Sequence, residues 1–246
     1  MSVSRGREQG LLDTQSAAVQ SLPPGKARDI CIHLQNAIFQ HRLLPGAKLS
    51  EDEVGDIFGA GRTVVRTALQ ALAHSELVTI ERNRGAFVAR PDKREANEVF
   101  EARALIEPRV ARMAAERCRN ADARKLRSHI KLEHEALAAE DLGTARSLSG
   151  QFHIAIADIA DHLVLSRMVR SLISRSSLII ALYWKRRETN CESHSHMALV
   201  DALASHDKDA AEEIMQSHMV DLHSGLDLKS QEAQQIPLAQ ALFSKR

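Results

Sequence analysis

Three histidines in the C-terminal half of the sequence have the residue type and the setting of metal ligands. His153, His196 and His218 each share a helical face with aliphatic side chains, so we expect all three to point into a core. Burying a polar group without a partner costs about 1–3 kcal/mol, but imidazoles from three helices can satisfy one another through a divalent ion. The alternative is three unrelated core histidines, each hydrogen-bonded locally. His194 is left out, because residues two positions apart on a helix point to different sides.

Arginines provide a second kind of chemistry in the N-terminal half. Five arginines fall between residues 62 and 90, against two glutamates, which makes a local basic patch. Arg62 and Arg66 are four positions apart, so both lie on one face of a predicted helix. A guanidinium can donate two hydrogen bonds to guanine or to a phosphate. The patch therefore predicts contact with DNA, and the alternative is a solvated basic face on a small helical domain.

The elements around these arginines follow the order of a winged helix-turn-helix. A first helix stops before a Leu-Pro-Gly turn. Ser50 and Glu53 form a capping box that starts a second helix, and the turn at 59–61 leads into a third. Two β-prone runs at 77–80 and 86–89 then form a hairpin, the wing.

This arrangement places particular residues at the DNA. The first residues of a recognition helix reach base edges in the major groove, and a wing reaches the backbone or the minor groove. The predicted DNA-contacting residues are Arg62, Thr63 and Arg66 on the helix and Arg82, Asn83, Arg84 and Gly85 at the wing tip.

From residue 93 onward every strong pattern is helical. The predicted helices span about 94–117, 121–140, 142–160, 163–185, 192–205 and 207–228. Pro108 is expected to kink or divide the first of them. The fold class is therefore mainly α, with a winged helix-turn-helix ahead of an all-helical bundle of about six helices. The predicted domains are a flexible arm (1–25), a DNA-binding domain (26–91), an effector-binding domain (94–228) and a polar tail (229–246).

Composition narrows the class of protein. The 33 Lys and Arg against 32 Asp and Glu leave a net charge of only +1, so global charge does not indicate nucleic-acid binding. Three widely spaced cysteines suit neither a disulfide framework nor a metal knuckle, which favours a reducing cytoplasm. A membrane span and a signal peptide are not expected. The sequence lacks HExxH, GxSxG, GxxxxGK[ST] and GxGxxG motifs, which argues against an enzyme.

The N-terminal segment resembles the DNA-binding domain of GntR-type bacterial transcription regulators. Residues 43–89 contain Pro-Gly, Leu-Ser-Glu, Arg-Thr-x-Val-Arg-x-Ala-Leu, Leu-Val and Arg-Gly-Ala-Phe-Val in the order and spacing of that family. The resemblance implies that the same helix and wing residues contact DNA. Four positions depart from the pattern. Gly61 stands where Ser or Thr is the usual N-cap, and Asp52 stands where a basic residue is common. Val64 and Thr67 stand where Pro and Glu are frequent.

The helical half resembles the FCD ligand-binding domain of the FadR subfamily. The resemblance rests on Glu101-Ala-Arg103 with Glu107, on Phe152-His153-x-x-Ile156, and on His196-x-x-Leu199-Val-x-Ala202-Leu with Asp207 and His218. It implies that the three histidines bind a divalent metal, zinc or nickel, which helps to hold a carboxylate effector. An aspartate common four residues before the first histidine is Ser149 here.

Arg103 is the predicted clamp for the effector, because a guanidinium pairs with a carboxylate through two hydrogen bonds. The alternative is a structural salt bridge with Glu107, four residues on. Arg146, Arg175 and Tyr183 are weaker candidates on neighbouring helices.

Together these patterns predict a cytoplasmic, ligand-responsive transcription regulator. We expect a homodimeric repressor that binds double-stranded operator DNA and a small-molecule effector, with no membrane partner. Two alternatives stay open at this point: a metal-dependent helical hydrolase, and a ligand-free helical dimerisation module attached to a DNA-binding head.

Overall fold

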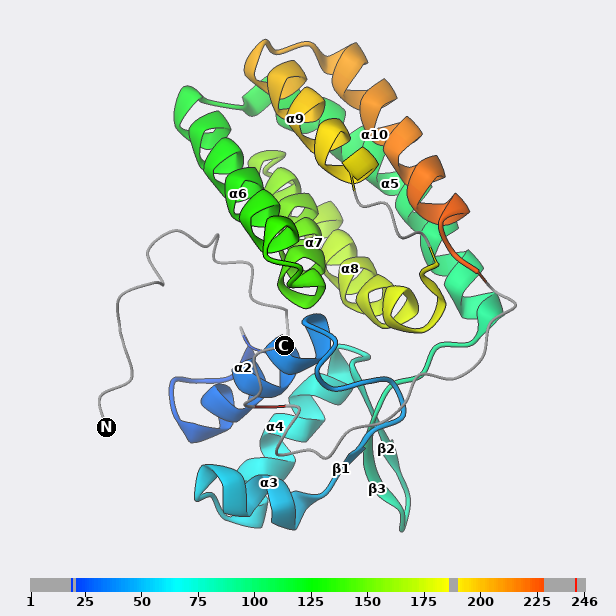
Figure 1. Ribbon diagram of the computed structural model, residues 1–246. Coiled ribbons are helices and arrows are strands. Elements are labelled where there is room, and N and C mark those ends of the chain that lie inside the picture. Colours follow the sequence, from blue (N-terminus) through cyan, green and yellow to red (C-terminus); the bar gives the residue numbers. More distant parts are fainter. Residues whose placement is uncertain (1–18, 20, 186–189, 228–241, 243–246) are drawn as a thin grey trace.

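The computed structural model describes residue 19, residues 21–185, residues 190–227 and residue 242, with the backbone alone described for 190–194. Figure 1 shows two parts, a smaller one with three short strands, which we call the head, and a helical bundle above it. The head contains α2 (Lys26–Phe39), β1 (Lys48–Leu49), α3 (Glu51–Phe58), α4 (Arg62–His74), β2 (Val78–Glu81) and β3 (Gly85–Val88). The bundle contains α5 (Lys93–Arg117), α6 (Asn120–Ala138), α7 (Leu142–Ile159), α8 (Leu163–Tyr183), α9 (Asn190–Ala204) and α10 (Lys208–Ser224).

The head is the predicted winged helix-turn-helix. Ser50 caps α3 by accepting a hydrogen bond from the backbone N–H of Glu53, as the capping box predicts. Gly59 ends α3 with φ 57°, a left-handed conformation that glycine adopts without a steric cost. The strands form one antiparallel sheet in the order β1-β3-β2. Strand β1 was not expected, because a strand of two residues is too short to leave a periodic pattern.

The bundle is made of the helices that the sequence predicts, and none of their ends differs by more than four residues from the expected one. Helix α10 packs along α5, and α6 packs between α7 and α9. Pro108 lies inside α5, which continues as one helix to Arg117, so of the two expected outcomes, a kink or a division, the division does not occur. Within the described residues, no helix is both long enough and apolar enough to cross a membrane.

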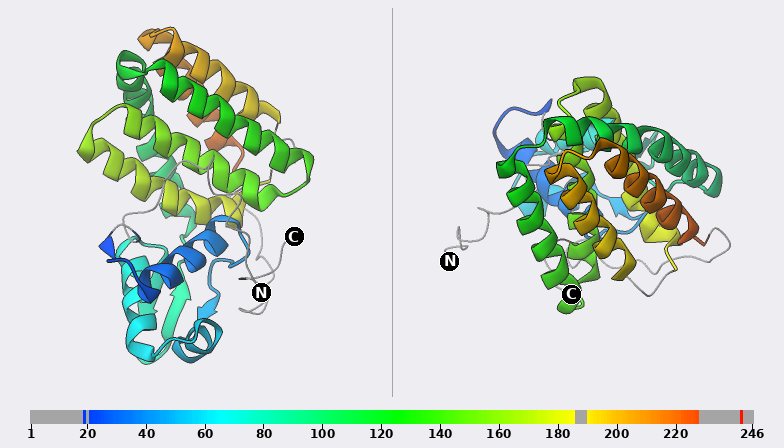
Figure 2. Two further views of the ribbon diagram at one scale, coloured as in Figure 1. Left: turned by 90° about the vertical axis from the view of Figure 1, so that its left-hand side faces the viewer. Right: turned by 90° about the horizontal axis from the view of Figure 1, so that it is seen from above.

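Head and bundle meet at the C-terminal end of α2, which lies against α7 and α8 (Figures 1 and 2). Gly143 in the first turn of α7 allows this approach, because a Cβ atom there would collide with the carbonyl oxygen of Gln40. His41 makes the turn after α2 with φ 53°, a left-handed conformation for a non-glycine residue. The junction is therefore packed closely at the end of one head helix.

The ends of the chain contribute a few described residues. Val19 and Leu22, at the end of the predicted arm, are buried in the apolar core of the head, and so is Leu242. The other residues of the predicted arm before Ser21, and of the predicted tail apart from Leu242, lie outside the described residues.

Candidate metal centre and DNA-contacting surface

The three predicted histidines meet in the centre of the bundle. His153 comes from α7, His196 from α9 and His218 from α10, and each is at most 2% exposed. One nitrogen of each ring lies within 4.8 Å of the corresponding nitrogens of the others. The Nε2 atom of His218 lies 3.2 Å from Nε2 of His196 and 3.3 Å from Nε2 of His153. The prediction that the three histidines point into the core is therefore confirmed, and their side chains lie together there.

Two buried carboxylates hold the opposite edges of two of these rings. Glu107 on α5 accepts a hydrogen bond from Nδ1 of His153 at 2.5 Å. Glu133 on α6 stands at 3.1 Å from Nδ1 of His196 in the same role. Carboxylates that orient histidines through the second ring nitrogen are typical of metal sites.

The number of hydrogens available in the cluster shows why its nitrogen atoms suit a cation. An ionised carboxylate can only accept, so Nδ1 carries the proton in His153 and His196, and their Nε2 atoms present lone pairs. Nε2 of His218 carries at most one hydrogen, so it cannot donate to the Nε2 atoms of both His153 and His196. A divalent ion at the meeting point of the three Nε2 atoms would satisfy all of them, and imidazole nitrogen is a favoured ligand of zinc and nickel.

Burial and neighbouring charges shift the pKa values of Glu107, His153 and His218 in the directions that favour metal binding. Burial alone would raise the pKa of Glu107, but the adjacent Arg103 and His153 outweigh it and hold that pKa at about 2. Burial lowers the pKa of His153, and it lowers the pKa of His218 well below the usual value, helped by the neighbouring imidazoles. Both shifts favour neutral rings at His153 and His218, and a neutral imidazole is the form that binds metal.

Arg103 takes part in the same buried network. Its Nε donates to Glu107 at 2.5 Å, and its Nη1 donates to Oγ of Ser176 on α8 at 3.2 Å. The salt bridge that the sequence offered as the alternative role is thus present. Arg103 also lines the cavity described next, so the pairing with Glu107 does not remove it from the reach of a ligand.

A cavity adjoins the cluster and reaches the head. Its polar lining comes from Arg103, Arg146, His153, Ser147, Ser149, Gln151, Ser176, Ser177 and His41. Its apolar lining comes from Phe39, Ile154, Ile173, Ile180, Trp184 and Leu222. Ser149 stands in the lining as a hydroxyl where an acid was the expected metal ligand. Two guanidinium groups and several hydroxyls suit a small anionic molecule that carries hydroxyl groups.

Two lining residues, Phe39 and His41, belong to the head. His41 is buried, and its Nε2 donates to the carbonyl oxygen of Ser177 at 3.1 Å. That bond leaves the lone pair on Nδ1, which accepts from Nη1 of Arg146 at 3.2 Å. One wall of the cavity is therefore a histidine that connects the bundle to the end of α2.

Two predicted effector residues stand elsewhere in the structure. Arg175 on α8 is paired with Glu76 of the head and with Glu95 of α5. The hydroxyl of Tyr183 donates to the carbonyl oxygen of Pro91, in the segment between head and bundle. Both side chains tie the two parts together, outside the residues that line the cavity.

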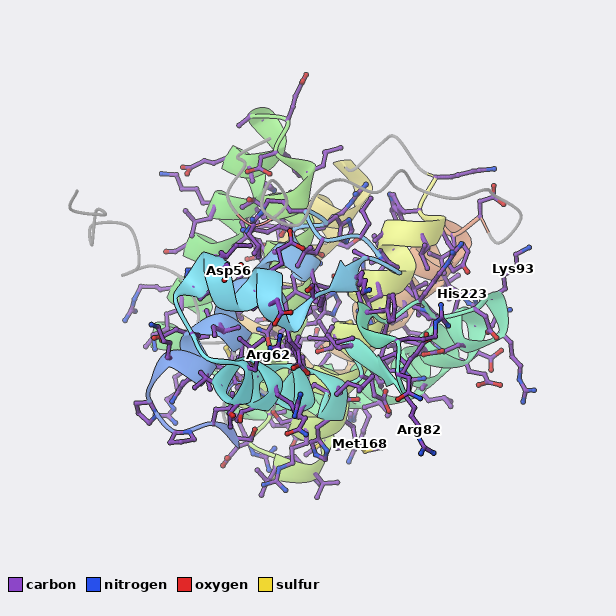
Figure 3. All side chains as sticks on the ribbon, turned by 90° about the horizontal axis from the view of Figure 1, so that it is seen from below. Asp56, Arg62, Arg82, Lys93, Met168 and His223 are labelled. Atoms are coloured by element: carbon purple, nitrogen blue, oxygen red, sulfur yellow. The ribbon has the colours of Figure 1, made fainter. Side chains whose placement is uncertain are left out.

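The predicted recognition helix presents its first residues to solvent. Arg62, Thr63 and Arg66 are exposed on α4, and Figure 3 shows Arg62 and Arg82 on the underside of the head, away from the bundle. Each arginine is paired with an acid of α3. Arg62 binds both carboxylate oxygens of Asp52, and Arg66 binds both of Glu51.

The predicted wing residues lie in and beside the turn between β2 and β3. Asn83 and Gly85 have φ values of 63° and 99°, which turn the chain between β2 and β3. Arg82 is exposed, whereas Arg84 is ion-paired with Glu81 and lies 5.5 Å from the ring centre of Phe87. All of the predicted wing residues are thus accessible at the tip.

Sequence reasoning missed three contacts of the candidate sites. Glu133 shares a face of α6 with buried residues such as Ile130, and an acid on an apolar face was the signal that could have found it. The role of His41 rests on partners more than 100 positions away, which no local pattern shows. Asp52 was noted as a departure from a family pattern, but its pairing with Arg62 was not expected.

Comparison with known proteins matches two families to two parts of the chain. Residues 26–88 match the family described as bacterial regulatory proteins, gntR family, and residues 98–221 match the FCD domain. The galactonate operon transcriptional repressor of Escherichia coli (strain K12) is 28% identical over 76% of this chain and 91% of its own length. The Uxu operon transcriptional regulator of the same organism is 31% identical over 62% of each chain.

A solved structure supports the fold. A GntR-type regulator from Rhodococcus sp. RHA1 aligns with a TM-score of 0.70 and 24% identity, covering 81% of this chain and 96% of that one. The related proteins are transcription regulators and not enzymes, so the hydrolase alternative is set aside. The chain belongs to the gntR family of bacterial regulatory proteins, as a ligand-responsive DNA-binding transcription regulator with an FCD effector-binding domain.

Proposed function

We propose that this regulator is a homodimeric repressor that a small hydroxylated carboxylate releases from its operator. The observation that carries the proposal is the cavity, because one lining contains His153 of the histidine cluster, two bundle arginines, and Phe39 and His41 of the head. A ligand there touches the sensing part and the DNA-binding part at once.

Operator binding is assigned to the underside of the head. Arg62, Thr63 and Arg66 enter the major groove at the start of α4, and the Arg82–Gly85 wing contacts the backbone or the minor groove. Two heads of a homodimer then read two half-sites of a palindrome. The exposure of these side chains on one side of the head supports this docking.

The histidine cluster is proposed to hold zinc or nickel through three Nε2 atoms. The support is the convergence of three buried imidazoles, two of them oriented by carboxylates, with one proton too few to satisfy each other. An ion bound there would supply a Lewis-acidic coordination site for a carboxylate oxygen of the effector. Ser149 stands where the family pattern has an acidic metal ligand. The coordination position of that acid is then open to the effector or to water.

The effector class follows from the cavity's donors. Arg103 and Arg146 suit a carboxylate, and the serines and Gln151 suit hydroxyl groups. One relative is named for the galactonate operon, and galactonate is a carboxylate with several hydroxyls. An effector carboxylate that takes the guanidinium of Arg146 competes with His41 for it. The head would thereby lose a contact to the bundle, and the population would shift toward the conformation that releases DNA.

The metal is tested by elemental analysis of the full chain. Wild type, a His196→Ala/His218→Ala variant and the control His134→Ala, an exposed histidine on α6, are exposed to zinc or nickel and then desalted. We expect about one metal ion per chain in wild type and in His134→Ala, and a negligible amount in the double variant. Equal and negligible metal in all three proteins contradicts the proposal.

The effector is tested by adding galactonate, and separately lactate and gluconate, to a complex of the full chain with a selected DNA duplex. We expect at least one of them to dissociate wild type from DNA. Arg146→Met should bind the same duplex and fail to respond, because it lacks the guanidinium that the carboxylate needs. Dissociation of both proteins at the same effector concentration refutes the role of Arg146.

A further inference from the structure

The pairing of Asp52 with Arg62 spans the two helices of the helix-turn-helix. Asp52 is the second residue of α3 and Arg62 is the first residue of α4. The two oxygens of Asp52 lie 2.6 Å from Nε and 3.0 Å from Nη2 of Arg62. Both side chains are open to solvent, with exposed fractions of 72% for the arginine and 62% for the aspartate.

Stability does not explain this pair. An exposed ion pair contributes little to folding, because water and salt screen it. The position is also unfavourable for binding DNA in general, since a carboxylate beside the recognition helix repels phosphate. A basic residue at this place would add a favourable phosphate or base contact. The aspartate therefore needs a reason that lies in the choice among DNA sequences.

The geometry of the guanidinium supplies that reason. Asp52 occupies the side edge of Arg62, formed by Nε and Nη2, and leaves Nη1 with the second hydrogen of Nη2 for another partner. That remaining edge is the one that can donate bidentately to O6 and N7 of guanine. A carboxylate that holds the side edge fixes the direction of the other edge, so fewer rotamers must be restricted when DNA binds.

The carboxylate itself can also read a base. Aspartate accepts a hydrogen bond from the N4 amino group of cytosine, and adenine offers an N6 amino group in the same groove. Guanine O6 and thymine O4 are acceptors, and either would face the carboxylate without a hydrogen between them. An aspartate beside an arginine thus favours an amino-bearing base next to the guanine that the arginine contacts.

A second pair on the same surface shows that the arrangement is not isolated. Arg66, one turn further along α4, uses Nε at 3.0 Å and Nη2 at 2.8 Å to hold both oxygens of Glu51. Glu51 is less exposed than Asp52, with an exposed fraction of 32%. Of the two acids, Asp52 is therefore the one whose carboxylate is more open to a base.

We propose that Asp52 is a specificity-determining residue of the operator interface. It orients Arg62 toward a guanine, accepts from an amino group of the neighbouring base, and weakens binding to DNA that lacks this step. The inference goes beyond the effector and metal proposals and depends on neither. It rests on the docking of the start of α4 in the major groove.

The test is a selection of preferred sequences from a random duplex library by the full chain. Four proteins are compared: wild type, Asp52→Ala, Arg62→Ala, and Asp56→Ala as a control that removes one exposed acid from the same helix, one turn away. We expect wild type and Asp56→Ala to select the same half-site, with an amino-bearing base beside a guanine. Asp52→Ala should lose the preference at that single position.

Affinities for the selected duplex and for a scrambled one complete the test. In Asp52→Ala we expect the ratio between the two to fall by about tenfold, in the range of one base contact, while affinity for the scrambled duplex rises and its salt dependence steepens. An unchanged base preference and an unchanged affinity ratio in Asp52→Ala overturn the proposal. If Arg62→Ala then no longer binds the selected duplex, the docking of α4 still holds. If Arg62→Ala binds the selected duplex like wild type, the docking fails and the proposal fails with it.

Discussion

The bundle and the head both contain arginine–carboxylate pairs, but they place them in opposite surroundings. Arg103 and Glu107 are each 2% exposed and share their network with His153. Arg62 holds both oxygens of Asp52, and both of these side chains are mostly exposed. Desolvation makes the buried pair depend on every one of its hydrogen bonds, whereas water can replace either partner of the exposed pair. The first pair therefore fixes a structure, and the second is available to a ligand.

The strongest way to break this comparison is to remove one acid from each region. Glu107→Ala leaves Nε of Arg103 and Nδ1 of His153 buried without the carboxylate that accepts from both of them. We expect it to lower the free energy of unfolding by about 3–5 kcal/mol, measured by urea denaturation with a chelator present. Asp52→Ala should lower it by no more than about 1 kcal/mol. Equal losses of unfolding free energy in the two variants would show that the buried and the exposed pair contribute alike to stability.

Metal should stabilise the bundle and leave the head unaffected. A ligand present at 100 times its dissociation constant adds about 2.7 kcal/mol to folding stability. We therefore expect zinc or nickel to raise the melting temperature of wild type and of His134→Ala, and to leave that of His196→Ala/His218→Ala unchanged. A rise of the same size in the double variant would place the ion somewhere other than the histidine cluster.

Glycine substitutions can separate the packed junction from the exposed surface that we propose to contact DNA. Gly143→Ala puts a Cβ against the carbonyl oxygen of Gln40, and relief of such overpacking costs about 1–3 kcal/mol. Gly61→Ala meets nothing within 4 Å and provides the matched control. We expect a lower melting temperature and a weaker effector response from Gly143→Ala alone. If both variants behave like wild type, α7 can move away from Gln40 without loss of stability or response, and the close packing of the junction is not required.

The smallest expected effect concerns the start of the recognition helix. Gly61 precedes α4 without a side-chain cap, in an extended conformation that serine adopts readily. Gly61→Ser supplies a hydroxyl acceptor for a free N–H of the first turn and should stabilise the protein by a few tenths of a kcal/mol. Thermal unfolding measures this, and binding to the selected duplex should not change. A loss of DNA binding would show that Gly61 itself lies against the backbone of DNA.

The sequence predicted the parts that depend on local pattern. Helix ends follow from capping and turn residues, and the wing follows from two β-prone runs around a polar turn. The inward direction of His153, His196 and His218 follows from periodicity, because a helix face repeats every three to four residues. The features that escaped prediction depend on distant partners. Nothing near His41 in sequence indicates Arg146 or Ser177, and nothing near Asp52 indicates that Arg62 holds it. Such contacts arise when elements pack, and a single sequence does not record them.

The turn after α2 bears on how this regulator could be recombined with others. Residues 39–42 are continuous with the head along the chain, but Phe39 and His41 line the cavity of the bundle. In a hybrid joined near Pro91, residues 39–42 would come from the foreign head, so the cavity of the bundle would lose its native Phe39 and His41. A transplantable sensor therefore has to include this short segment from the other side of the joint, so that the functional boundary of the module is discontinuous in sequence.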